Sequence, residues 1–184
     1  MSGHSHWHSI KYMKTAADAK KGKIFSKISR QISIAAKEKG GDPNANPSLR
    51  TAVEKAKEYN MPKDSIERAI QKGTGQLPGE KLESIVLEAY GLAGIAIIIE
   101  GITDNRNRTI GEIRQILSQN NGKLVGGGGV QWLFERKIKG PGVLGWKAKQ
   151  EIEVAKKDKE DCQKLFEALD ENEAVQEIYS NIKI

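Results

Sequence analysis

The 184-residue sequence contains a single cysteine, Cys162, and few aromatic residues, which make up 5% of the chain. One cysteine cannot form an internal disulfide, and it cannot supply a cysteine-rich zinc site. The most apolar run, residues 91–102, contains Glu100 and is much shorter than the ~20 residues that cross a bilayer. The chain also begins without the apolar stretch of a secretory signal. These absences predict a soluble, cytoplasmic protein without structural disulfides.

Signatures of catalysis are missing as well. The glycine run at residues 125–130 (VGGGGV) lacks the lysine and serine of a P-loop, and no serine has the context of a nucleophile elbow. Cys162 is expected on an amphipathic helix beside three acidic residues, which would raise the pKa of its thiol. His4, His6 and His8 all lie in one terminal tail, so no folded core positions them as a base. We therefore expect no enzyme activity and no cofactor.

Positive charge is concentrated at the start of the chain. The whole sequence has a formal net charge of +6. Residues 1–78 hold 15 basic and 7 acidic residues, whereas residues 79–184 hold 15 basic and 17 acidic residues. Within residues 1–39, nine basic residues are opposed only by Asp18 and Glu38. This asymmetry indicates an anionic partner for the first part of the chain, with a merely solvated basic helix as the alternative.

Periodicity predicts three amphipathic helices before residue 78. The first spans about Lys14–Lys39, and its apolar positions recur at spacings of four, four and three, which places them on one stripe. These positions are Ile24, Ile28, Ile32 and Ala35. Asn46 caps a second helix that runs to about Tyr59, and a third helix ends at Gly73. Helices joined by such short turns predict a three-helix bundle.

After a linker at residues 73–79, the period changes to that of strands. Strands are predicted at 82–90, 95–103, 130–136, 149–155 and 175–179, and helices at 109–120 and 158–170. The order β-β-α-β followed by β-α-β predicts a ferredoxin-like α+β domain. We therefore expect an α+β multi-domain protein, with a basic three-helix bundle and its N-terminal arm in residues 1–78 and the ferredoxin-like domain in residues 79–184.

The polar side of the first helix carries a second stripe, which is basic. Its members follow one another at spacings of three, four and three and have no interleaved acids. Such a stripe suits contact with successive phosphates better than a purely solvated face does. With neighbouring lysines and the tail tryptophan, the predicted nucleic-acid-binding residues of the first domain are Trp7, Lys11, Lys14, Lys20, Lys21, Lys23, Lys27 and Arg30.

The tail itself, Gly3–His8, has alternating histidines of the kind seen in metal sites. It has no companion cysteine or nearby carboxylate cluster, so we expect no metal there. Two alternatives remain open for Trp7, which either stacks on a base or packs the tail against the bundle.

Two arginines stand between a predicted strand and the helix that follows it. Arg106 and Arg108 lie where cations oppose the helix dipole. They either bind an anion at the helix N-terminus or pair with a carboxylate within the fold. Both are included among the predicted nucleic-acid-binding residues.

Five segments, in order, resemble the YebC/PmpR family. They are Gly3–Trp7 (GHSHW), Lys21–Lys27 (KGKIFSK), Gly40–Arg50 (GGDPNANPSLR), Asn60–Pro62 (NMP) and Asp104–Thr109 (DNRNRT). The resemblance is dense over residues 1–137 and looser over residues 146–184. One departure is minor, because Tyr90–Gly94 reads YGLAG where the family usually has Tyr-Gly-Pro-Gly-Gly.

The resemblance implies a helical domain and two α+β domains, the third inserted within the second. In this chain residues 138–146 stand at the place of that insertion, and the third domain is essentially absent. Family members are described as probable transcriptional regulators, with relatives that act as translational activators. We therefore expect a DNA-binding transcriptional regulator. The alternatives are a ribosome-associated translation factor that contacts RNA and an adaptor whose basic face meets an acidic protein.

Overall fold

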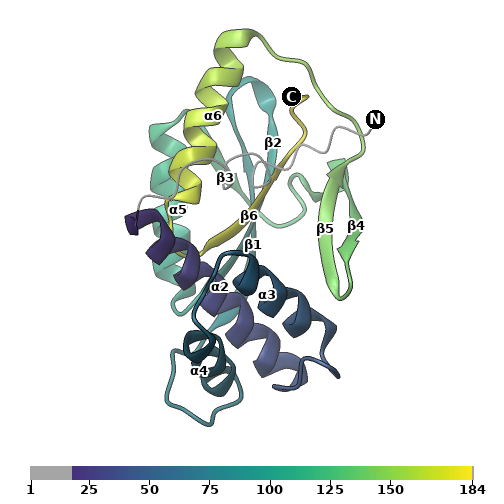
Figure 1. The fold of residues 1–184 in the computed structure, drawn as a ribbon. Coiled ribbons are helices and arrows are strands. Elements are labelled where there is room, and N and C mark those ends of the chain that lie inside the picture. The colour runs from purple at the N-terminus through teal and green to yellow at the C-terminus, as the bar shows by residue number, and fades with distance from the viewer. Residues whose placement is uncertain (1–17, 184) are drawn as a thin grey trace.

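The computed structural model describes the backbone of residues 18–183 and the side chains of residues 21–183. Its elements in chain order are α2 (Asp18–Lys39), α3 (Pro47–Glu58), α4 (Lys63–Gly73), β1 (Glu83–Tyr90), η1 (Leu92–Gly94), β2 (Ala96–Thr103), α5 (Arg106–Gln119), β3 (Lys123–Val125), η2 (Gln131–Leu133), β4 (Phe134–Gly140), β5 (Val143–Ala148), α6 (Lys156–Asp170) and β6 (Val175–Ser180). Figure 1 shows α2–α4 below the sheet, α5 and α6 to its left, and the β4–β5 hairpin to its right. The helical region, residues 18–73, thus precedes an α+β region, residues 83–183.

The helical region is built around the apolar stripe of α2. Its predicted members are buried against residues of α3 and α4, which confirms the periodicity. Asn46 caps α3 as predicted, because its side-chain oxygen accepts a hydrogen bond from Leu49 N at 3.1 Å. Close packing of α2 and α4 requires glycine at one point, since a Cβ on Gly73 would lie 2.3 Å from the Ser33 carbonyl oxygen. The main sequence signals of this region therefore agree with its packing.

The α+β region contains a four-stranded sheet in the order β3-β1-β2-β6, and each of its three strand pairs is antiparallel. One face of the sheet packs with α5 and α6 around a core that includes Ile97, Ile99, Ile113 and Leu165. The other face carries Ile98 and packs against the β4–β5 hairpin. β2 is buried on both faces, which explains its nearly continuous apolar sequence.

The α+β class is confirmed, but the chain order is not that of a ferredoxin-like domain. In the βαββαβ order a helix connects the first two strands. Here β1 and β2 pair directly through the short η1 turn, and the first helix of the region follows β2. The predicted boundary at residues 78 and 79 falls within the connection between α4 and β1.

Two predicted strands also differ from the structure. Residues 130–136 contain the 3₁₀ turn η2, and strand β4 begins only at Phe134. β4 pairs with β5 through a turn at Pro141-Gly142, where Gly142 has a φ of 72°. No strand is predicted over residues 143–148, so this partner strand was missed. Residues 149–155 form no strand and make a single bridge, from Ile152 to Ile182.

Cys162 is predicted to be unreactive in the folded protein. It is buried on α6, and burial, followed by the charges of Asp158 and Asp161, raises the pKa of its thiol to about 11. At pH 8 the thiolate fraction of Cys162 is therefore far below that of an ordinary thiol. Labelling with Ellman's reagent should therefore be slow in buffer and immediate in concentrated guanidinium chloride. Equal rates in the two conditions would contradict the packing of α6.

Candidate nucleic-acid interface

The basic stripe of α2 faces the α+β region. Lys27 Nζ donates hydrogen bonds to Asp170 Oδ1 at 3.0 Å and to the Asp170 carbonyl oxygen at 2.6 Å. Lys27 is only 5% exposed. Asp170 is the last residue of α6, so the ammonium group lies at the negative end of that helix. This pair joins α2 to the C-terminal end of α6.

Burial and the aspartate act on Lys27 in opposite directions. Burial lowers the pKa of Lys27, because the charged ammonium group loses solvation, and the Asp170 carboxylate partly offsets this effect. A buried ion pair adds little stability compared with an apolar pair of similar volume, but removing one partner leaves an uncompensated charge. The contact therefore specifies how the two regions are oriented.

The neighbouring lysine of the stripe also has a carboxylate partner. Lys23 forms an ion pair with Glu171, and both side chains are substantially exposed. An exposed pair of this kind is weak and sensitive to salt. For Lys23 or Lys27 to contact a phosphate, the nucleic acid would have to displace Glu171 or Asp170.

Arg30 completes the contact between the regions. Its Nη1 donates to the carbonyl oxygen of Ile102 at 3.1 Å. Its Nη2 lies 3.8 Å from a carboxylate oxygen of Glu80 and 3.7 Å from one of Glu173. Sequence spacing found the stripe correctly, but it could not show that acidic residues after α6 would meet it.

The other predicted residues of the first domain lie at or beyond the limit of the described chain. Trp7, Lys11 and Lys14 lie outside the described residues, and so does the side chain of Lys20. Lys21 is exposed near the start of α2. Their contacts with nucleic acid stay predictions.

Arg106 and Arg108 are exposed on the first turn of α5, in the α+β region. Arg106 Nη1 lies 3.9 Å from a carboxylate oxygen of Glu83. Arg108 pairs with Asp104, and its hydrogen bond lowers the pKa of that carboxyl group. Of the two alternatives open for these arginines, pairing within the fold is present in the structure.

A polar groove of about 430 Å³ lies where α2, α4 and the following connection meet. Sequence reasoning missed it, because its residues come from separate segments. Hydroxyl and cationic side chains share its walls, including Ser26, Ser29, Ser33, Arg30, Lys37 and Lys72. Glu80 and Glu173 also line it, near Arg30. Lys37 Nζ donates to the Leu82 carbonyl oxygen at 2.8 Å, which fixes its position at the rim. The serines at spacings of three and four were the signal available in the sequence.

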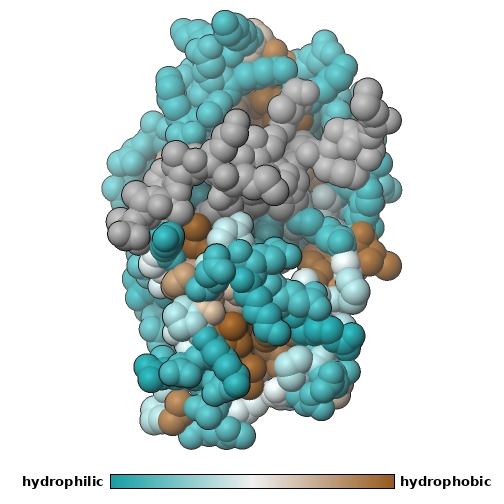
Figure 2. Space-filling view, in the orientation of Figure 1, coloured by the Kyte–Doolittle hydropathy of each residue, from teal (hydrophilic) through white to brown (hydrophobic). Residues whose placement is uncertain are grey.

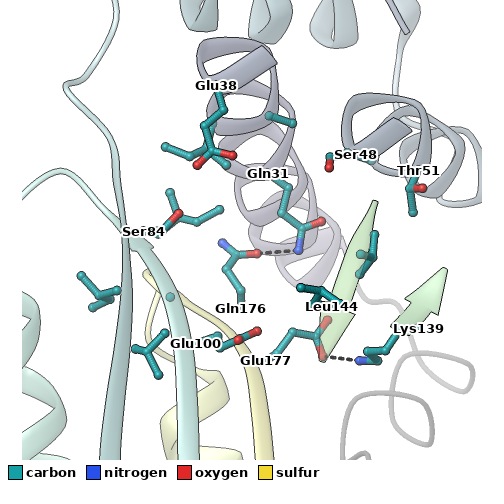
Figure 3. Close-up of a pocket in the computed structure, with 18 of the residues that line it drawn as sticks. Gln31, Glu38, Ser48, Thr51, Ser84, Glu100, Lys139, Leu144, Gln176 and Glu177 are labelled. Carbon is teal, nitrogen blue, oxygen red and sulfur yellow. Dashed lines mark hydrogen bonds and ion pairs between the residues drawn. The ribbon is translucent and has the colours of Figure 1, made fainter. Parts of the chain in front are cut away.

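A second hollow, of about 420 Å³, lies between α2, α3, the sheet and the β4–β5 hairpin. Figure 3 shows Gln31 and Gln176 reaching toward each other in it, and Gln31 Nε2 donates to Gln176 Oε1 at 2.8 Å. Its charges are largely paired with one another, as in the ion pair of Lys139 with Glu177. The tip of the hairpin contacts α3 through a hydrogen bond from Ser48 Oγ to Gly142 O at 2.9 Å. The cleft suits phosphate less well than the polar groove does.

The glycine-rich loop after β3 is organised by a carboxylate of its own chain. Glu88 is buried, and its two carboxylate oxygens accept hydrogen bonds from the backbone N–H groups of Gly128, Val130 and Gln131 at 2.7–2.9 Å. These are the donors that a phosphate would need in a nucleotide cradle. These donors are therefore occupied and do not form a P-loop-type cradle for nucleotide phosphates.

Two further observations limit the functions to consider. Among the described residues, no helix combines the length and apolar character that crossing a membrane requires. In the same part of the chain, no group of three or more histidine, cysteine, aspartate or glutamate side chains could hold a metal ion. The three histidines of the tail lie outside it.

Comparison with known proteins places this architecture in a family. The "TACO1/YebC protein N-terminal domain" matches residues 5–76, and the "TACO1/YebC second and third domain" matches residues 82–139. A probable transcriptional regulatory protein of Fervidobacterium nodosum is 39% identical, in an alignment that covers all of this chain and 94% of that protein. The chain belongs to the TACO1/YebC family.

Other TACO1/YebC relatives match in sequence and in fold. A probable transcriptional regulatory protein of Geobacter sulfurreducens is 55% identical over 137 residues, which are 74% of this chain and 56% of that protein. The crystal structure of a conserved hypothetical protein from Aquifex aeolicus superposes with a TM-score of 0.86 at 31% identity, covering 97% of this chain and 96% of the other. The Fervidobacterium alignment has 238 positions, more than the 184 residues of this chain, so it places gaps here.

The match to the second and third domains ends at residue 139, within β4. β5 follows after a short turn and pairs with β4, so the two strands form a closed hairpin. The hairpin exposes two apolar side chains that lie opposite each other, Ile138 and Leu144. Figure 2 shows an apolar area at the right, where Figure 1 places this hairpin.

Replacement of Lys27, whose ammonium group is buried, should destabilise the protein much more than replacement of the more exposed Lys23. We expect Lys27→Met to lower the free energy of unfolding by about 2–4 kcal/mol, because the largely desolvated Asp170 carboxylate then loses Lys27 as an ion-pair partner. Lys23→Met should change it by less than about 1 kcal/mol. Urea denaturation followed by circular dichroism measures both.

A double variant, Lys27→Met with Asp170→Leu, separates the ion pair from packing. It should recover part of the loss, because no unpaired charge remains. Equal effects of the two single lysine variants would show that the buried pair does not join the regions.

Proposed function

We propose that this chain is a non-catalytic, nucleic-acid-binding regulator of gene expression that acts in the cytoplasm as a DNA-binding transcriptional regulator. The observation that carries the proposal is the surplus of basic over acidic residues in residues 1–78, 15 against 7. The printed description of its relatives, probable transcriptional regulatory protein, supports the same function.

The polar groove between α2 and α4 is the described surface best suited to phosphates. Serine hydroxyls donate hydrogen bonds to phosphate oxygens, and lysine supplies charge without demanding one geometry. Lys37 and Lys72 line the groove and are exposed. Trp7, Lys11, Lys14, Lys20 and Lys21 are further proposed contacts, on the sequence pattern alone. Lys23 and Lys27 would join it only where their carboxylate partners are displaced.

RNA on the ribosome is the second candidate partner, and the chemistry of the groove favours it. The exposed cations of the groove are lysines, Lys37 and Lys72, and its arginine, Arg30, is already bonded to the Ile102 carbonyl oxygen. Such a surface contacts phosphates and carries little information about base sequence. A translation factor that recognises folded RNA needs less base discrimination than a transcriptional regulator does.

The groove is tested by removing two of its charges. Lys37→Gln with Lys72→Gln should weaken binding to duplex DNA and flatten the log–log salt dependence of affinity by up to about 1.8, or about 0.9 for each lost contact. Mobility-shift titrations at several salt concentrations measure this slope. An unchanged slope in a folded variant would remove the groove from the proposal.

A matched control removes the same charge elsewhere. Lys156 and Lys157 are exposed at the start of α6, the end of that helix opposite Asp170. Changing both to Gln should leave the slope within experimental error. If the control lowers the slope as much as the groove variant does, binding depends on net charge alone.

The choice between DNA and RNA needs a separate experiment. Selection from random duplexes, beside sedimentation with ribosomes at near-physiological salt, distinguishes the two. One strongly enriched duplex motif, with no protein in the ribosome pellet, supports transcription. Ribosome co-sedimentation without an enriched motif supports translation.

A further inference from the structure

The turn before the β4–β5 hairpin presents a tryptophan to solvent. Trp132 is 63% exposed, although it lies on an ordered 3₁₀ turn. Its indole Nε1 donates to the Gly129 carbonyl oxygen at 3.1 Å, so the polar atom of the ring is satisfied by its own loop. Glu88 fixes the position of the turn, because its carboxylate accepts hydrogen bonds from the backbone N–H groups of Val130 and Gln131. The ring is therefore both exposed and positioned before any ligand arrives.

Trp146, the other tryptophan in the described part of the chain, is packed within the protein and differs in this from Trp132. Trp146 Nε1 donates to Glu100 Oε1 at 2.8 Å, and the Arg136 guanidinium covers its ring at 3.7 Å from the centroid. Trp146 thus serves the packing of the hairpin on the sheet. Among the described residues, no cation covers the ring of Trp132 in the same way.

The glycine loop beside Trp132 leaves more bare surface than its fold requires. A Cβ on Gly129 would lie 2.7 Å from Val125 Cγ2, and Gly128 has a φ of 84°, so these two positions need glycine. Gly126 and Gly127 have no such φ, and a Cβ on either would meet nothing within 4 Å. The backbone of the loop is therefore bare at these two positions, in the same loop whose Gly129 carbonyl oxygen bonds to the indole, and another molecule could approach it closely.

The surroundings of this turn are basic. Residues 134–149 contain five lysines and arginines and one acidic residue, Glu135. Lys149 Nζ donates to the Trp132 carbonyl oxygen at 2.8 Å. Lys137 and Lys147 lie on the hairpin face opposite Phe134 and Trp146, which pack toward the sheet. A partner that carries both negative charge and flat aromatic groups complements the exposed indole ring and the lysines around it.

We infer that Trp132, Gly126–Gly127 and Lys147 and Lys149 form a stacking platform for an unpaired base of single-stranded RNA or DNA. The base lies on the indole ring over the bare glycines, and the lysines contact the flanking phosphates. The inference rests on the proposed nucleic-acid function and adds a second contact surface, in the α+β region, with a stated preference for unpaired bases. Duplex DNA does not use the platform, because its bases are already stacked on one another.

Fluorescence anisotropy with full-length protein variants tests the inference. The labelled probes are an unstructured 12-nucleotide RNA, the single-stranded DNA of the same sequence and a blunt duplex. Trp132→Ala should weaken binding to both single strands by about 5- to 100-fold, the range for one stacked base. Trp132→Phe should keep most of the affinity, because it keeps an aromatic face. Neither variant should change duplex binding by more than about twofold, as stacking makes no contribution there.

A second pair of variants tests the bare loop without touching the ring. Gly127→Leu should weaken single-strand binding, because the added side chain covers the bare backbone over which the base is proposed to lie. Gly111→Leu adds the same bulk on α5, where a Cβ also meets nothing within 4 Å, and should have no effect. Circular dichroism melting of each variant monitors the fold.

The outcomes separate this inference from the proposed function. Selective loss of single-strand binding in Trp132→Ala and Gly127→Leu supports the platform. Unchanged single-strand binding in both variants, with the wild-type protein still bound to nucleic acid, overturns the platform and leaves the proposed function in place. Absence of binding by the wild-type protein to all three probes overturns both.

Discussion

The contact of the buried Lys27 ammonium group with Asp170 joins the helical region to the α+β region. It places the middle of α2 against the C-terminal end of α6, where the helix dipole and the carboxylate both favour a cation. Desolvation makes such a pair costly unless each group is satisfied, and here the ammonium reaches both a carboxylate and a carbonyl oxygen. The polar groove and the cleft on either side of α2 take their shapes from this orientation.

Where the two regions meet, basic side chains of α2 are paired with carboxylates. Lys23, Lys27 and Arg30 face carboxylates of the α+β region, so part of the basic surplus in residues 1–78 is neutralised within the protein. Exposed lysines line the polar groove (Lys37 and Lys72) and the β4–β5 hairpin (Lys137 and Lys147), and others lie elsewhere, as at the start of α6.

The β4–β5 hairpin lies at the end of the family match, which stops at residue 139 within β4. β4 and β5 pair closely, and their tip bonds to α3 through Ser48 and Thr51. The hairpin therefore contacts both the helical region and the sheet. Ile138 and Leu144 stay exposed there because neither region covers that part of the hairpin.

Local patterns in the sequence were enough for the helices and for the long strands. The stripe from Ile24 to Ala35, the cap at Asn46 and the apolar run of β2 depend on neighbours within a few residues, and all appear as predicted. β5 was missed, because a six-residue strand carries little periodicity and gains its stability from a partner strand. The strand predicted over residues 149–155 is absent, because that segment finds no partner beyond the single bridge from Ile152 to Ile182. Family membership also followed from local motifs alone.

Long-range contacts decided what the side chains do. Spacing put Lys23, Lys27 and Arg30 on one stripe, but whether that stripe meets phosphate or carboxylate depends on Asp170, Glu171 and Glu173, about 140 residues later in the chain. Glu88 and the glycine loop are likewise about 40 residues apart, and only their contact turns the loop into a support for Trp132. Charge and periodicity are properties of the sequence, whereas the partner of each charge is fixed only when distant segments pack together.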